Sequence, residues 1–322
     1  MVGTMLANNR RHKLKALGVE VLHVGDDVIL KRGCIEARFS GKGIAEAVNL
    51  LLMAASDNAL TRKELHDLFA ATAKSNVDRL IDHLIERRFL VYADQSQQPS
   101  HDDENSLDIF YWHFGRSTRE VSKQLKEVHP TILGVNVISA RLVDALSATG
   151  FGPCQVIDHP GLRNERQYRE VQDHINKYGT ILKKWRLEEW AKRDNRQGSD
   201  CVVATSDFGS QEVLCEWNAF CVQQSKPFLP VFLKNFIGYL GPFVLPGTTA
   251  CFECLRARQN SHLQHREASR MVEAASQKAQ LVIGFHPSMA SVLGEIAAFE
   301  LTKVYSGVLP HSKVGKLVEL NL

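Results

Sequence analysis

The feature that most constrains the fold lies in the second half of the chain, where short apolar runs alternate with helical patterns from about residue 129 onward. The runs "TILGV", "CQVIDH", "DCVVATS" and "PFLPVFLKN" have the length and β-branched content of buried strands. Helical patterns such as "ISARLVDALSATG" separate them. Strands joined through helices form parallel sheets that are covered on both faces. The sequence therefore predicts an α/β domain with a mostly parallel sheet over residues 129–322.

Four further elements complete this predicted domain. The charged segment 165–192 is interpreted as helical, and residues 237–247 as a hairpin at the edge of the sheet. A long helix is expected over residues 288–307 because its apolar residues recur with helical spacing. Residues 315–322 are expected to form the final strand.

The first 95 residues show a different pattern and predict a small α+β domain. Residues 19–39 alternate like strands, with turn residues at "GDD" and "RG", which indicates a three-stranded antiparallel meander. Three helices follow, and the second opens with a capping box formed by Thr61 and Glu64. The third helix places apolar residues on one face before the strand "FLVY". This order of elements is typical of a winged-helix-like domain.

The clearest linker lies between these two patterns. Residues 93–106, "ADQSQQPSHDDENS", are polar, contain Pro and show no periodicity. The aromatic cluster "IFYWHFG" follows, and we expect it to begin the second domain or to lie across it as a strap. Residues 96–128 are therefore assigned to a linker and strap between the domains at 1–95 and 129–322.

Composition limits the class of protein. The chain has 322 residues and a net charge of +3, without a long Lys/Arg run, so charge gives little support for a nucleic-acid partner. Its seven cysteines are scattered, which does not suggest a disulfide framework. Apolar stretches are too short to span a bilayer, and the basic N-terminus lacks the apolar core of a signal peptide. We therefore expect a cytoplasmic protein without a membrane partner.

The loop after the strand at residue 131 is where a nucleotide-binding loop would lie. It reads "GVNVIS", with Gly134 present but Asn136 and Ser139 where glycines would let phosphate approach. An ordinary strand-to-helix turn is the preferred interpretation. Asp158 and Asp207 end strands where such sheets bind ligands, but acidic residues at these places also cap helices. Arg166 lies near the same sheet edge in sequence.

The chain contains one Cys-x-x-Cys pair, Cys251 and Cys254, just after a Pro-Gly turn. Two thiolates supply half of a tetrahedral zinc site. His262 and His265 are the nearest further candidate ligands, and their spacing places both on one helix face, but a solvated helix surface is the preferred interpretation of that pattern.

Two stretches together resemble one family, the ThiF-like leader-peptide-binding partners of YcaO cyclodehydratases. The segment "PFLPV…GYLGPFVLPGTTACFECLRAR", with the later helix "AAFELTKVYSG", is similar to the Gly-Pro and Cys-x-x-Cys region of ThiF-like domains. The N-terminal meander with "LIERRFLVYAD" resembles the peptide-recognition element of PqqD-like proteins. The resemblance covers nearly the whole chain in the same order and implies a Rossmann-like, ThiF-type second domain.

The resemblance implies capture of the leader of a ribosomally made precursor peptide, by strand addition to an open sheet edge. The expected edge is residues 34–39 and the second wall is the helix at 77–88, although core packing accounts equally well for each side chain taken singly. The peptide-binding residues so implied are Cys34, Ile35, Glu36, Ala37, Arg38, Phe39, Leu80 and Leu84.

The same resemblance implies the partners and cofactors. A YcaO cyclodehydratase would use ATP to form azolines, a flavin dehydrogenase is a further partner, and this chain would be a non-catalytic homodimer. Its nucleotide site, with Gly134, Asp158, Arg166 and Asp207, would be vestigial. ThiF-like domains usually hold zinc with two Cys-x-x-Cys pairs, so we expect zinc to be lost here, with ligands from elsewhere or beyond residue 322 as the alternatives.

Two other functions fit parts of the sequence. An adenylating enzyme of the ubiquitin-activating superfamily would use Asp158, Arg166 and Asp207, but its loop glycines and an acceptor cysteine are not evident. A winged-helix transcription regulator would read DNA with residues 76–88. That helix carries three acidic and three arginine side chains, unlike a DNA-reading helix.

Overall fold

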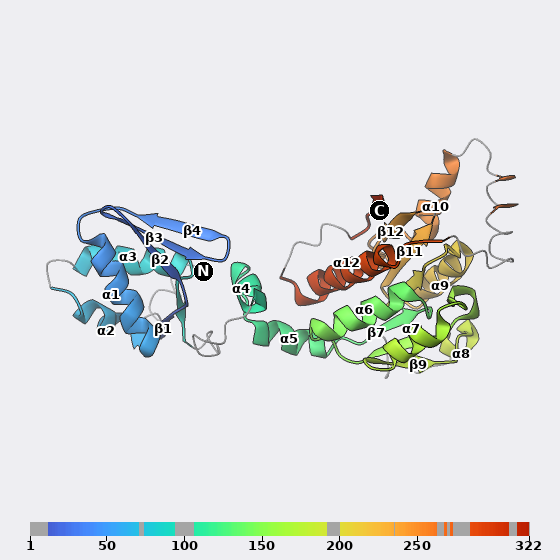
Figure 1. Cartoon of the computed structure of the whole chain (residues 1–322), viewed down its shortest axis with the longest axis horizontal. Coiled ribbons are helices and arrows are strands. Elements are labelled where there is room, and N and C mark those ends of the chain that lie inside the picture. The colour runs from blue at the N-terminus through green and yellow to red at the C-terminus, as the bar shows by residue number, and fades with distance from the viewer. Residues whose placement is uncertain are drawn as a thin grey trace. The chain divides into compact units, whose positions relative to one another are not determined.

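The chain folds into two units, residues 1–121 and 122–322, each with its own hydrophobic core (Figure 1). The computed structural model describes residues 12–70, 74–93, 106–191, 200–234, 236–262, 267–268, 271–272, 284–308 and 314–321. The α/β class predicted from the sequence is confirmed, and so is the mostly parallel sheet of the second unit.

The N-terminal unit contains the predicted meander. Strands β2 (Glu20–Val24), β3 (Asp27–Arg32) and β4 (Ile35–Phe39) form an antiparallel sheet in that order. Both connections are two-residue turns that begin with glycine, and Gly25 and Gly33 have positive φ angles of 63° and 58°. Glycine at the first turn position is typical of the type II′ turn, whose twist matches that of the strands.

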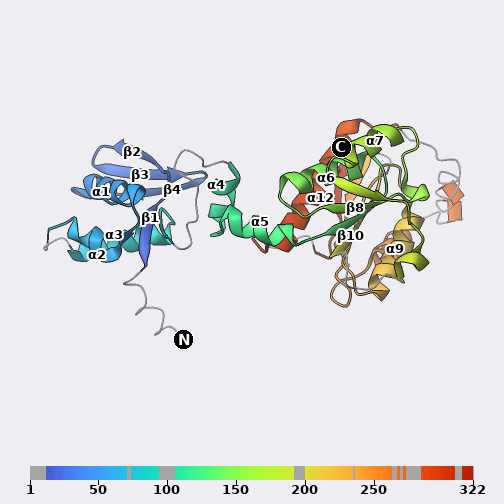
Figure 2. The same ribbon diagram turned by 90° about the horizontal axis from the view of Figure 1, so that it is seen from below.

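Three helices cover one face of this meander: α1 (Ile44–Asp57), α2 (Arg62–Asp67) and α3 (Lys74–Glu86) (Figures 1 and 2). The predicted capping box is confirmed. The backbone N–H of Glu64 donates to Thr61 Oγ1 at 3.2 Å, and the Thr61 N–H donates to the Glu64 carboxylate at 2.7 Å. The apolar face of α3 is buried as expected, with Ile81 and Leu84 fully enclosed.

A second small sheet was not expected from the sequence. It has the order β5-β1-β6, formed by β5 (Leu60–Thr61), β1 (Lys13–Ala16) and β6 (Leu90–Tyr92). Strand β6 corresponds to the predicted strand "FLVY". Its partner β1 comes from the start of the chain, and short local patterns do not reveal such long-range pairing.

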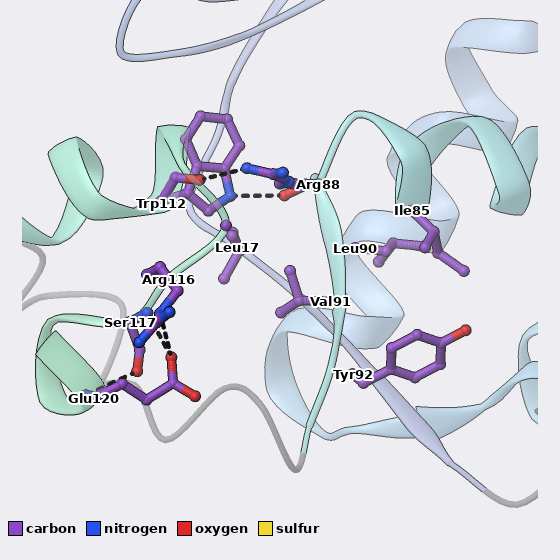
Figure 3. Close-up of a pocket in the computed structure, with 11 residues that line it drawn as sticks. Leu17, Ile85, Arg88, Leu90, Val91, Tyr92, Trp112, Arg116, Ser117 and Glu120 are labelled. Atoms are coloured by element: carbon purple, nitrogen blue, oxygen red, sulfur yellow. Dashed lines mark hydrogen bonds and ion pairs between the residues drawn. The ribbon is translucent and has the colours of Figure 1, made fainter. Parts of the chain in front are cut away.

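The aromatic cluster lies in the N-terminal unit rather than at the start of the second one. It forms helix α4 (Ser106–His113). Trp112 is buried in the N-terminal core beside Phe89, and its indole N–H donates to the Arg88 carbonyl at 2.9 Å. The Arg88 guanidinium in turn donates to the Trp112 carbonyl (Figure 3). It also donates to the carbonyl of His113. These contacts tie α4 to the end of α3, and helix α5 (Thr118–Lys126) follows.

The C-terminal unit is built on a seven-stranded sheet with the order β13-β12-β11-β10-β7-β8-β9. The five strands from β11 to β9 are parallel to one another. Strand β12 pairs antiparallel with β11, and β13 pairs antiparallel with β12. The strands are β7 (Pro130–Leu133), β8 (Cys154–Ile157), β9 (Gly179–Leu182), β10 (Cys201–Ser206), β11 (Phe228–Lys234), β12 (Ile237–Leu240) and β13 (Val318–Asn321).

Helices α6 (Val137–Ala148) and α12 (Pro287–Ser306) lie on one side of this sheet and α9 (Gln211–Gln223) on the other (Figure 2). The glycine at position 294 lets α12 approach α6 closely, because a Cβ there would lie 2.9 Å from the Ile138 carbonyl oxygen. The helices of this unit, with one 3-10 turn, are α6 (Val137–Ala148), η3 (Pro160–Leu162), α7 (Tyr168–Ile175), α8 (Leu187–Ala191), α9 (Gln211–Gln223), α10 (Phe252–Ser261) and α12 (Pro287–Ser306).

Two predictions for this unit are wrong. The segment 165–192 is not one helix, because β9 interrupts it and pairs in parallel with β8. The strand "GTIL" was missed because it is short and lies between charged segments. The hairpin at 237–247 does not form the sheet edge, since β12 pairs with β13, which takes the edge position. Among the described residues, no helix is both long and apolar enough to cross a membrane.

Candidate functional site

Strand β4 is an open sheet edge, since within the described structure its one strand partner is β3. The two-residue turn makes Arg32 and Ile35 the closing pair, which exchanges hydrogen bonds in such hairpins. Alternation then directs the backbone groups of Ile35, Ala37 and Phe39 toward β3. The N–H and C=O groups of Glu36 and Arg38 therefore face the open edge.

A groove of about 570 Å³ runs between β4 and α3. We call it the β4–α3 groove. Its apolar lining includes Phe39, Ile44 and Leu80, and its α3 flank carries Arg79, His83 and Arg87. The volume is typical of ligand sites. Open backbone groups beside an apolar floor are what strand addition by a peptide requires.

The structure brings together only part of the predicted peptide-binding set. Residues 36–39 and Leu80 line the groove. Leu84 is fully buried in the core, Ile35 packs against that core, and Cys34 lies outside the groove with its sulfur 3.5 Å from His113 Nε2. Lining residues that sequence reasoning missed are Ser40, Ile44, Asn76, Arg79, His83 and Arg87.

A second cavity in this unit, of about 600 Å³, has an apolar wall from β6 and a polar wall from the segment before α5 (Figure 3). Its polar side chains already have partners. Arg88 donates to two carbonyls of α4, and the Arg116 guanidinium lies 3.6 Å from the Glu120 carboxylate. The β4–α3 groove is therefore the better candidate for a polar ligand.

In the second unit, the predicted nucleotide residues lie at the carboxyl ends of β7, β8 and β10. Gly134 has a φ of 106°, and a Cβ there would lie 2.6 Å from the Thr205 carbonyl oxygen, so the turn requires glycine. Asn136 and Ser139 form a capping box at the start of α6: the Ser139 N–H donates to Asn136 Oδ1 at 3.1 Å, and the Asn136 N–H donates to Ser139 Oγ at 3.0 Å.

The Asp207 carboxylate also lies at the start of α6. Its Oδ2 accepts from the Val137 N–H at 3.2 Å and from Asn164 at 2.8 Å. Its Oδ1 has no hydrogen-bond partner among the described residues, and burial raises the pKa of this carboxyl group. The chain's own side chains thus occupy two amide groups that a phosphate would use at this helix terminus.

Both oxygens of the Asp158 carboxylate also accept hydrogen bonds from neighbouring side chains. Arg163 donates to both carboxylate oxygens, at 2.8 and 3.0 Å, and the Tyr168 hydroxyl donates at 2.7 Å. Arg166, the residue implied by resemblance, is exposed, and the arginine that pairs with Asp158 is Arg163. The adjacent His159 is buried, which lowers its pKa to about 4.

The cysteine pair lies at the start of α10, with the sulfur atoms of Cys251 and Cys254 3.5 Å apart. Burial raises the pKa of Cys251, but hydrogen bonds, mainly with Cys254, lower it below the ordinary value overall. Within the described part of the chain, no three His, Cys, Asp or Glu side chains gather as a metal site. His265 lies outside the described residues. Two thiols do not fit a four-ligand zinc site, and the loss of zinc stays a prediction that elemental analysis can test.

No protein-family model and no curated protein matches this chain. Solved structures do match its fold. The structure of E. coli MccB with succinimide has a TM-score of 0.66 at 15% identity, covering 96% of this chain and 93% of that chain. The microcin C7 biosynthetic enzyme MccB in complex with N-formylated MccA gives a TM-score of 0.66 at 16% identity, with the same coverage. The heterocyclase TruD gives 0.60 at 18% identity, covering 96% of this chain and 40% of that chain.

At these identities the likeness shows a shared fold. The ThiF-like, Rossmann-type architecture expected for the second unit is confirmed, and the alignment extends over almost the whole chain.

Proposed function

We propose that this protein binds an extended segment of a precursor peptide at β4 and presents it to a partner enzyme during maturation of a ribosomally made peptide. The observation that carries this proposal is the open edge of β4, with the backbone groups of Glu36 and Arg38 facing a groove. MccB, which shares the fold, has been solved with AMPCPP and MccA and with N-formylated MccA.

The proposed partner is a YcaO cyclodehydratase that uses ATP to form azolines, and a flavin dehydrogenase would oxidise those rings. The fold shared with the heterocyclase TruD supports this direction. A non-catalytic role agrees with the buried thiols: burial raises the pKa of Cys154, Cys201 and Cys221 to about 12, so they stay protonated and are poor nucleophiles. We propose a cytoplasmic location for this complex.

ATP would be bound by the partner rather than by this chain. The start of α6 is occupied by Asp207 and Asn136, and a carboxylate there repels a phosphate. One observation favours an adenylating enzyme instead, namely the buried Asp207 Oδ1 without a partner in the described structure. ATP–pyrophosphate exchange catalysed by the purified protein would establish that alternative.

We also propose a homodimer of the second units through α12. Most apolar residues of this helix, including Leu293, Ala297 and Leu301, are buried within the unit. Val292 and Phe299 are exposed seven residues apart, on one side of the helix, and are the candidate contacts. Light scattering at tens of micromolar tests this, and a purely monomeric protein would contradict it.

The function is tested by reconstitution with a YcaO enzyme and a precursor peptide encoded beside this gene. We expect labelled leader peptide to bind by fluorescence anisotropy, and the enzyme to remove one water per ring only when this protein is present. An enzyme that cyclises its substrate equally well without this protein contradicts the proposal.

A further inference from the structure

We infer that the β4–α3 groove selects an extended peptide that carries carboxylates on alternate residues. This inference rests on the proposed function and adds the chemistry of the peptide. It starts from residues 76–88, whose three acidic and three arginine side chains are distributed unevenly around the helix by the fold.

Two of the three acidic residues of α3, Asp78 and Asp82, are held on the side of the helix that faces α2. Asp78 accepts from Arg62 at 2.9 Å and lies 2.6 Å from His66, while Asp82 accepts from Arg62 at 2.5 Å. Burial raises the pKa of Asp78, but the bonds with His66 and Arg62 outweigh it and hold that pKa below its ordinary value. Asp78 and Asp82 are therefore paired with side chains of α2 and do not line the groove.

The basic residues form a row along the groove. Arg79, His83 and Arg87 are spaced four residues apart, which places them on one side of a helix. Arg87 follows α3 but keeps its register, because its N–H donates to the His83 carbonyl at 2.9 Å. His83 lies 3.5 Å from the exposed Glu86 carboxylate. Arg79 and Arg87 are exposed and make no ion pair with any described residue.

The opposite wall adds little compensating charge. Arg38 is already paired with Asp27. Among the described residues that line the groove, Glu36 is the one acidic side chain, and it stands against the two guanidinium groups of Arg79 and Arg87. A peptide with carboxylates at this flank would supply the missing counter-charges.

The spacing of the row matches an added strand. Four residues of an α-helix rise about 6 Å. Alternate residues of a β-strand, which share one face, lie about 6.6–6.8 Å apart. Carboxylates at every second residue could therefore lie opposite successive residues of this row, while neighbouring apolar side chains reach the lining formed by Phe39, Ile44 and Leu80. This concave apolar lining favours a peptide over a nucleic-acid duplex.

The experiment measures binding of labelled peptides to the full chain by anisotropy at low and high salt. One peptide alternates Val with Glu, and matched peptides replace Glu by Gln or Lys. We expect the Glu peptide to bind at least tenfold more tightly than the Gln peptide at low salt, and this preference to shrink as salt screens exposed charges. The Lys peptide should bind most weakly.

The variant Arg79→Gln/Arg87→Gln should lose most of the preference for Glu. The control Lys63→Gln/Arg119→Gln removes the same charge from exposed positions outside the groove and should keep it. Equal affinity for the three peptides, or a preference that survives in the groove variant, overturns the inference. So does tighter binding of a DNA duplex that depends on Arg79 and Arg87, because the row would then contact nucleic acid.

These failures differ from failure of the proposed function. If charge has no effect but a proline in β4 still abolishes binding of a leader peptide, strand addition stands and only the charge selection is wrong. If neither these peptides nor the leader binds the folded protein, peptide capture itself is wrong.

Discussion

The two candidate sites of this molecule differ in how many of their polar groups already have partners. At the β4–α3 groove, the backbone groups of Glu36 and Arg38 face an open edge, and Arg79 and Arg87 lack ion-pair partners among the described residues. At the carboxyl ends of β7 and β10, in contrast, side chains of the chain itself fill the start of α6.

This difference affects the free energy of binding a ligand at each site. A ligand that meets open donors replaces only water, whereas a ligand that must displace internal hydrogen bonds leaves buried groups unpaired, at a cost of about 1–3 kcal/mol each. We therefore expect a ligand to bind more readily at the N-terminal groove than at the start of α6. Four predictions test this contrast, from the largest expected effect to the smallest.

Trp112→Ala should destabilise the groove-bearing unit most. Trp112 is buried against the core of that unit and bonds to Arg88, and removal of such a side chain costs about 3–5 kcal/mol. Urea unfolding followed by NMR should show this loss in the N-terminal unit while signals of the second unit persist. Phe114→Ala, which removes a partly exposed ring nearby, should cost far less. Equal losses for both variants would mean that α4 is not anchored in this core.

Glu36→Pro should weaken leader binding at least tenfold, about 1.4 kcal/mol. Proline removes an N–H that faces the open edge and places its ring there, while the hydrogen bonds between β4 and β3 remain. Anisotropy with a labelled leader peptide measures the loss. Glu36→Gln separates the side-chain effect from the backbone effect.

The matched control is His23→Pro, at an outward-facing position on the opposite edge strand, β2. It should leave binding nearly unchanged. An equal loss in both proline variants would show that the β4 edge is not the specific site.

Asp207→Asn should stabilise the protein at neutral pH by about 1 kcal/mol, because a buried charge with an unpaired oxygen is removed. Burial raises the pKa of Asp207 in the folded state, so ionisation costs stability above that pKa. This cost disappears as pH falls toward the pKa of the unfolded chain. Urea unfolding at several pH values should therefore show an advantage of the variant that shrinks in acid.

The control for this position is Asp158→Asn, which removes the charge that Arg163 and Tyr168 satisfy and should destabilise the protein at neutral pH. If both variants lose stability equally, the two carboxylates are compensated alike and the contrast between them is wrong.

The smallest expected effect is the absence of any response to ATP. Calorimetry with Mg-ATP should detect no binding heat at physiological concentration, because the start of α6 is closed by Asn136 and Asp207. A micromolar ATP site that Asp207→Ala abolishes would contradict this prediction and favour the adenylating alternative.

Local patterns in the sequence determined much of the architecture. Glycine-led turns and period-two alternation specify the β2–β4 meander, Thr61 and Glu64 specify a helix start, and apolar runs specify the buried strands of the second unit. These features depend on residues close together in the chain, so their physics is visible in short windows. The open β4 edge facing α3, in contrast, was expected from the resemblance to a peptide-recognition element rather than from these local patterns.

Only the tertiary structure decided which groups remain without partners. It pairs β1 with β6, inserts β9 beside β8, buries Trp112 in the first core and uses Asp207 to fill the start of α6. It also decides which charges of residues 76–88 are compensated: Arg62 and His66 pair with Asp78 and Asp82, whereas Arg79 and Arg87 have no ion-pair partner among the described residues. Counting residues fixes the total charge, but the free energy of binding depends on the partners each charge finds in space.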